Sequence, residues 1–369
     1  MPNISNEIVT FCAGNAKTSD FITAFQDYYV QTREMRDGLK LFAYDTNVSY
    51  DEKSKKISDA FFAEVEARSG VKRTADNISS WCANPNVKWA AMAVIDATIN
   101  SVLPLTINPS IGAFTDLKFV SYGDIVHYTI KPRTLYTVSL GAHGERTTHR
   151  QLKASGDLIV TPKEHIVTVY ADMFSVLSGK QDLADFVRLV VMSVETEMTK
   201  DIMSALTTGM AQGTYPAALS IQGAFNTQTL INLAETVQAY NYGSRPVIMG
   251  TASALAQVVP DSAIGARINV DGLDGSISIL KNFYGYTLIQ LPQVATGDYT
   301  NFSLAMDPDT VYVISPAMDK VVKTVVSNTL TNSNQFYDNA DLTSNYTFRK
   351  DWDAVFASAA FAGMYKITG

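Results

Sequence analysis

Residues 341–367 read DLTSNYTFRKDWDAVFASAAFAGMYKI, and this closing segment decides the predicted fold. Its first part, SNYTFRKDW, mixes aromatic residues with polar and basic ones, as a strand with one solvated face does. Its second part, DAVFASAAFAGMYKI, is mostly apolar and predicts a buried final strand. The tail of the chain, residues 336–369, is therefore predicted to consist of strands.

The segment before this tail, residues 246–335, alternates predicted strands with one short helix at 252–259. The strand patterns are VIMG, YTLIQLP, TVYVISP and VVKTVV. This alternation with Gly-rich turns is typical of a compact α+β unit. A helix over 226–240 comes before it and is broken by YGSRP.

The clearest helix covers residues 182–208, where apolar residues recur at steps of three and four. We expect it to end at Gly209. About 25 residues at a rise of 1.5 Å give a rod of about 37 Å, long enough to span a subunit. The first part of the chain, residues 1–115, carries three shorter helical patterns, around Phe25, around Phe61 and from Trp89 to Val102. Pro104 is expected to stop the third helix.

Residues 116–178 change to a period of two, as in long strands, with Ile125, His127 and Thr129 on one side. GAHGERTTHRQLK, at 141–153, interrupts them and predicts the charged tip of a two-stranded flap. Such a hairpin without a strong apolar face is marginal alone in water, so we expect it to lie on another subunit. The candidate intersubunit contacts at its tip are His143, Glu145, Arg146, His149, Arg150 and Lys153.

The composition limits the possible partners. A chain of 369 residues suggests two or three structural units at roughly 150 residues each. Charged residues make up 18%, and 29 Lys and Arg against 36 Asp and Glu give a net charge of −7. This balance argues against a broad basic face that grips nucleic acid, so any DNA nearby is contained rather than tightly bound. Charged residues such as Asp96, Arg188 and Glu195 interrupt the most apolar segments, so we expect no membrane partner.

Motifs that specify catalysis are missing from the sequence: GxGxxG, GxxxxGK[ST], HExxH, GxSxG and CxxC do not occur. We therefore predict no catalytic, cofactor-binding or metal-binding residues, and a protein that is not an enzyme. The competing interpretation is a soluble β-rich enzyme. It rests only on 18 Tyr and 3 Trp, which serve cores and interfaces equally well.

The order of these parts resembles the major capsid proteins of tailed bacteriophages of the Hong Kong 97 type. The resemblance covers about residues 105–369 and rests on RPVIMG, GYTLIQLPQV at 285–294, TVYVISPAMDKVV and the closing segment. It implies an α+β fold with an N-terminal helical arm (1–115), an extended hairpin called the E-loop (116–178) and a P-domain with a spine helix (179–245). A mixed A-domain (246–335) and C-terminal strands that return to the P- and A-domains (336–369) complete it.

The resemblance also implies a function. The chain is expected to be a structural subunit that self-assembles into hexamers and pentamers of an icosahedral shell around double-stranded DNA. It would reside in the virion capsid after assembly in the host cytoplasm, with portal, scaffold or cementing proteins as further partners and without cofactors. An alternative with the same fold is an encapsulin-like compartment that encloses cargo enzyme. The long helical N-terminal region argues against that alternative.

Overall fold

The computed structural model describes most of the chain. The described residues are 16–37, 44, 47–106, 109–121, 124–130, 156–170, 183–211, 217–258, 282–296, 300–327, 334–338 and 343–368. Everything that follows concerns these residues.

The N-terminal region forms a helical bundle, as predicted. Its helices are α2 (Ala16–Asp37), α3 (Tyr50–Ser69), α4 (Ile78–Ala83) and α5 (Pro85–Thr106). Helix α3 begins where the Ser49 hydroxyl accepts the Glu52 N–H, and it ends at Gly70, whose φ of 71° suits glycine. The prediction that Pro104 stops the third helix is wrong, because α5 runs on to Thr106. Proline removes one backbone hydrogen bond and crowds the carbonyl four residues earlier, and the helix ends two residues after it rather than before it.

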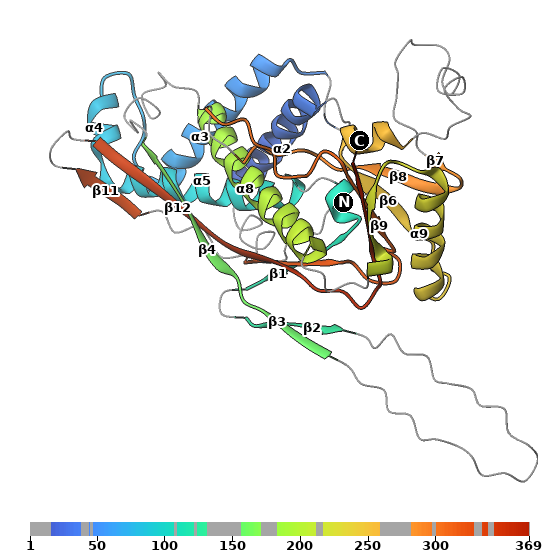
Figure 1. Cartoon of the computed structure of the whole chain (residues 1–369). Coiled ribbons are helices and arrows are strands. Elements are labelled where there is room, and N and C mark those ends of the chain that lie inside the picture. The colour runs from blue at the N-terminus through green and yellow to red at the C-terminus, as the bar shows by residue number, and fades with distance from the viewer. Residues whose placement is uncertain are drawn as a thin grey trace, which may run out of the picture.

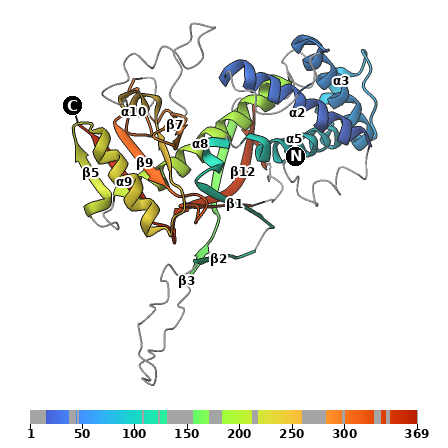
Figure 2. The same ribbon diagram turned by 90° about the vertical axis from the view of Figure 1, so that its right-hand side faces the viewer.

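Helix α8 (Leu183–Ala211) is the predicted long helix, and it passes through Gly209 instead of ending there. Gly209 has another role. A Cβ at this position would overlap the side chain of Phe356, so glycine allows the helix to approach the end of a strand closely. In Figure 2, α8 lies between the N-terminal helices and the strands on the opposite side of the molecule.

The first sheet lies against α8 and is built around a long strand. Its described strands have the order β1 (Thr115–Val120), β10 (Val322–Ser327), β12 (Thr343–Phe356) and β11 (Asn334–Asp338), and β4 (Lys163–Tyr170) also pairs with β12. Only β1 and β10 run parallel. The predicted break between SNYTFRKDW and DAVF is absent, because β12 is one strand of 14 residues. Phe348 and Trp352 on its buried face join the same core as Val191 of α8.

The second sheet has the order β5 (Ser220–Gly223), β13 (Gly363–Ile367), β9 (Thr310–Ile314), β6 (Val247–Gly250), β8 (Tyr286–Gln290) and β7 (Asn282–Phe283). Helices α9 (Thr227–Tyr240) and α10 (Ala252–Gln257) pack on it through Leu230 and Leu255. Three predicted strands of residues 246–335 are confirmed in this sheet. The fourth, VVKTVV, is confirmed as strand β10, and it pairs in the first sheet. The closing strands return to both sheets, β12 to the first and β13 to the second.

A separate two-stranded sheet forms the root of the predicted flap. Strand β2 (Val126–Ile130) pairs antiparallel with β3 (Gly156–Val160), and Val126 lies opposite Val160. The short helix α6 (Pro109–Gly112) comes before β1, and the 3-10 turn η1 (Ala217–Leu219) comes before β5. In Figures 1 and 2 the β2–β3 hairpin projects away from the rest of the described structure.

Candidate subunit interface

One face of the β2–β3 hairpin is anchored to its own subunit through Tyr128. The Tyr128 hydroxyl donates to the Thr324 carbonyl at 3.1 Å, and the Asp116 carbonyl lies at 3.3 Å. The Lys118 ammonium sits 4.0 Å from the centre of the ring. Val126 and Val160 on the same face are buried. Burial raises the pKa of Tyr128 and keeps the hydroxyl a donor.

The opposite face of this hairpin points to solvent. On it, His127 Nδ1 lies 2.7 Å from Asp157 Oδ2 across the two strands. Ile125 and Ile159 are 63% and 56% exposed. Exposed isoleucines on a projecting hairpin are costly in water, which makes this face a candidate for contact with a neighbour.

A compact junction ties β4, in the second half of the flap segment, to the long helix α8. The His165 ring of β4 stacks on Trp352 of β12, with ring centres 3.6 Å apart and planes 6° apart. The Trp352 indole N–H donates to Asp201 Oδ2 of α8 at 2.9 Å, and His165 Nε2 lies 3.3 Å from the same oxygen. Because Trp352 is fully buried, this junction fixes the root of the flap relative to the helix.

A second junction joins α2 to α8 through a buried carboxylate. The Tyr29 hydroxyl donates to Glu195 Oε2 at 2.7 Å, and Arg33 Nη2 lies 2.6 Å from Glu195 Oε1. The Arg33 and Glu195 side chains are each 8% exposed. A buried charge is tolerated only when it is paired and hydrogen-bonded, and Glu195 meets both conditions. The N-terminal helices are therefore a fixed part of the subunit core.

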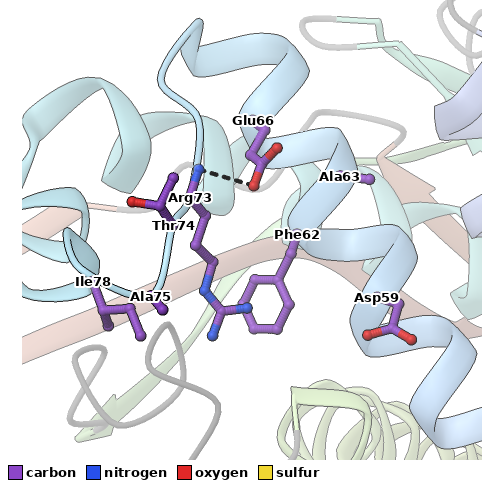
Figure 3. Close-up of a pocket in the computed structure, with 8 residues that line it drawn as sticks. All are labelled: Asp59, Phe62, Ala63, Glu66, Arg73, Thr74, Ala75 and Ile78. Atoms are coloured by element: carbon purple, nitrogen blue, oxygen red, sulfur yellow. Dashed lines mark hydrogen bonds between the residues drawn. The ribbon is translucent and has the colours of Figure 1, made fainter.

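Figure 3 shows an open cleft of about 420 Å³ on the surface of the helical bundle. The Arg73 guanidinium lies 3.9 Å from the centre of the Phe62 ring, and the Arg73 backbone N–H donates to Glu66 Oε1 at 3.0 Å. Both contacts hold the loop between α3 and α4. The cleft is lined by Asp59, Phe62, Ala63, Glu66, Arg73, Thr74, Ala75 and Ile78.

The described residues contain no group of three or more His, Cys, Asp or Glu side chains placed to hold a metal ion. In the same part of the chain, no helix combines the length and the apolar character needed to cross a membrane.

The six candidate contacts predicted at the flap tip, His143, Glu145, Arg146, His149, Arg150 and Lys153, lie outside the described residues. They remain predictions. The sequence did not identify the two junctions or the Tyr128 anchor. One signal was available, since Glu195 is a carboxylate on the apolar face of a predicted helix, between Val191 and Met198.

Comparisons with known proteins give a consistent result. The model of a family described as SPbeta prophage-derived putative capsid protein YonB matches residues 38–365. No curated protein matches the chain. Among solved structures, the capsid of the native GTA particle is 10% identical with a TM-score of 0.50, over 70% of this chain and 90% of that chain.

Two further solved structures are similar with lower scores. The mature capsid of bacteriophage PhiM1 is 11% identical over 70% of this chain and 87% of that chain, with a TM-score of 0.47. The procapsid of satellite phage P4, solved with its size determination protein, is 9% identical over 73% and 89%, with a TM-score of 0.48.

Proposed function

This chain belongs to the family of SPbeta prophage-derived putative capsid proteins named YonB, and on that premise we propose that its copies form hexamers and pentamers of an icosahedral shell. The chain is a phage major capsid protein with a Hong Kong 97-like capsid fold. It is a structural subunit of the virion capsid rather than an enzyme. Neither the encapsulin-like compartment nor the β-rich enzyme is favoured.

We propose the subdomains of this fold as follows: an N-terminal arm with helices at 1–115, the E-loop at 116–178 and the P-domain with α8 as its spine helix at 179–245. The A-domain follows at 246–335, and the C-terminal strands at 336–369. The pairing of β12 in the first sheet and β13 in the second supports strands that return to both domains. The pairing of β10 with β1 and β12 ties the end of the A-domain segment to the first sheet.

The flap is proposed to lie over a neighbouring subunit. Two observations support this: the anchored face fixes the hairpin on its own body through Tyr128, and the opposite face leaves Ile125 and Ile159 exposed. At its tip, Arg146, Arg150 and Lys153 would pair with acidic groups of the neighbour, and His143, Glu145 and His149 would add polar contacts. A low charge fraction favours such broad contacts between copies.

Further partners are proposed from the same function. Double-stranded DNA would be contained rather than bound by sequence, because a net charge of −7 lets packed DNA slide. Portal, scaffold or cementing proteins would act with the shell, which would assemble in the host cytoplasm. No cofactor is required for any of these roles.

The single observation that carries this proposal is the family match over residues 38–365. The experiment compares the full chain with a variant that lacks residues 142–150, using light scattering and negative-stain imaging. We expect the full chain to form capsomers, tubes or closed shells, and the variant to stay folded without forming shells. Normal shells from the variant would contradict the role of the flap, and a full chain that never forms multimers would contradict the assembly itself.

A further inference from the structure

We propose that two tyrosine-bearing turns at one end of the six-stranded sheet form a contact surface for a second copy of this chain. The turns are residues 240–246, after α9, and residues 282–287, which include the β7–β8 hairpin. We call them the tyrosine patch. The inference rests on the proposed self-assembly and adds the surface that takes part in it. In Figure 1, α9 lies beside β7 and β8 at one end of the molecule.

The two turns form one surface because direct contacts join them. The Arg245 guanidinium donates to the Gly285 carbonyl, and the Tyr286 hydroxyl donates to Gln238 Oε1 at 3.3 Å. A side chain at Gly285 would meet the Arg245 guanidinium, so the glycine permits this approach. The patch is thus held in place by its own subunit.

The patch presents large aromatic side chains to solvent. Tyr240, Tyr242 and Tyr284 are 62%, 44% and 59% exposed. Tyr240 lies edge-on to Phe361, and Tyr284 lies edge-on to Phe283. The Tyr242 side chain makes no hydrogen bond or ring contact with any described residue. Tyrosine and arginine are the residues most enriched among the strongest contributors to protein interfaces.

Backbone conformation gives an independent reason to assign the patch a function. Tyr242 has a φ of 57° and Tyr284 a φ of 45°, and they are the only non-glycine residues with positive φ in the described part of the chain. Each is followed by a glycine with positive φ, the pattern of turns that favour Asn-Gly or Asp-Gly. A tyrosine in this region is strained relative to glycine. Such strain clusters at functional sites, and both turns keep a tyrosine where Asn or Asp would fit with less strain.

Charge indicates which partner fits. The two turns, YNYGSRP and NFYGYT, contain one arginine and no carboxylate. Burial raises the pKa of Tyr286 and the nearby Glu235 of α9 raises it further, so Glu235 and Arg245 together leave the patch close to neutral on a chain with a net charge of −7. Two acidic copies repel each other over most of their surfaces, and this neutral patch is a place where they can meet. A standard interface uses roughly 20 to 30 residues on each side, so the patch is one part of a larger contact.

The test separates the side chain from the backbone. Asparagine and glycine adopt positive φ more readily than tyrosine, so Tyr242→Asn and Tyr242→Gly keep the turn while removing the ring. We expect both variants to unfold at the same denaturant concentration as the unchanged chain, or a higher one, when unassembled. Their critical concentration for assembly, measured by light scattering, should rise at least fivefold. Tyr242→Phe, which keeps the ring, should rise less than twofold.

A matched charge pair tests the acidic partner. Tyr242→Glu should weaken assembly more than Tyr242→Lys does, and the difference should shrink at high salt because screening reduces it. If Tyr242→Gly and the unchanged chain had equal critical concentrations for assembly, the patch would be overturned. It would also be overturned if Tyr242→Gly lost enough folding stability to explain its weaker assembly. If Tyr242→Lys weakened assembly more than Tyr242→Glu did, the inference that the partner is an acidic copy would be overturned. If the unchanged chain itself did not assemble, the proposed function rather than the patch would fail.

Discussion

Gly209→Ala offers a sharp test of how α8 packs on the first sheet, because two effects of known size oppose each other. In an exposed helix interior, replacing glycine with alanine stabilises by about 0.5 to 1 kcal/mol. Here, however, the added Cβ would overlap three atoms of the Phe356 side chain. Overpacking of this kind costs about 1 to 3 kcal/mol, since helix or ring must shift. The net result is a loss between about 0 and 2.5 kcal/mol in the free energy of unfolding, and the overlap with three atoms favours the upper end of that range.

The assay is urea denaturation of the unassembled chain, followed by tryptophan fluorescence. The control is the same substitution in a Phe356→Gly background, where both the ring and the Cβ that the new methyl group would meet are gone. In that background Gly209→Ala should be neutral or stabilising by up to about 1 kcal/mol. A stabilising effect of Gly209→Ala in the unchanged chain would refute the close approach of α8 to Phe356.

Three further outcomes are expected. Trp352→Phe removes the indole N–H that donates to the Asp201 carboxylate. It should lower the free energy of unfolding, measured by thermal denaturation, by about 1 to 2 kcal/mol, and an unchanged value would contradict the junction. Arg33→Met removes the Arg33 cation from the buried Glu195 carboxylate and should cost about 3 kcal/mol of the free energy of unfolding. Arg33→Met combined with Glu195→Leu should cost less, as a double-mutant cycle in urea can measure, and an equal or greater cost would contradict the buried pair. Burial lowers the pKa of Lys350 to about 8 from its usual 10.5, so between these pH values the unfolded chain binds more protons than the folded one. The contribution of this group to stability should therefore rise with pH across that window by up to about 3 kcal/mol, and a pH series on Lys350→Met that keeps the full rise would argue against the burial.

Local patterns in the sequence predicted the individual elements well. Apolar residues at helical spacing correctly placed α3 around Phe61 and α9, and alternation placed the root of the flap. The misplaced boundaries have physical causes. Gly209 resembles a helix terminator, but it serves a close approach to Phe356, a residue far away in the sequence. Long-range strand pairing joins β10 to β1 and β12, and no local pattern in VVKTVV specifies that partner.

The sites were harder to predict than the elements. Trp352, His165 and Asp201 come from three separate segments, so only the folded chain brings them together. The turn YGSRP was identified as a helix break, but the positive φ of Tyr242 within it has no signature in the sequence. Glu195 carried a signal that the sequence analysis did not use: a carboxylate in an apolar helical stripe needs a buried partner, and the fold supplies Arg33.

Electron cryomicroscopy of the particles formed by the full chain tests the central claim most directly. The account predicts closed shells whose rings of five and six copies each contain the described body, with the β2–β3 hairpin of one copy directed onto its neighbour. A chain that remains a monomer or dimer at every protein and salt concentration tested would contradict the account.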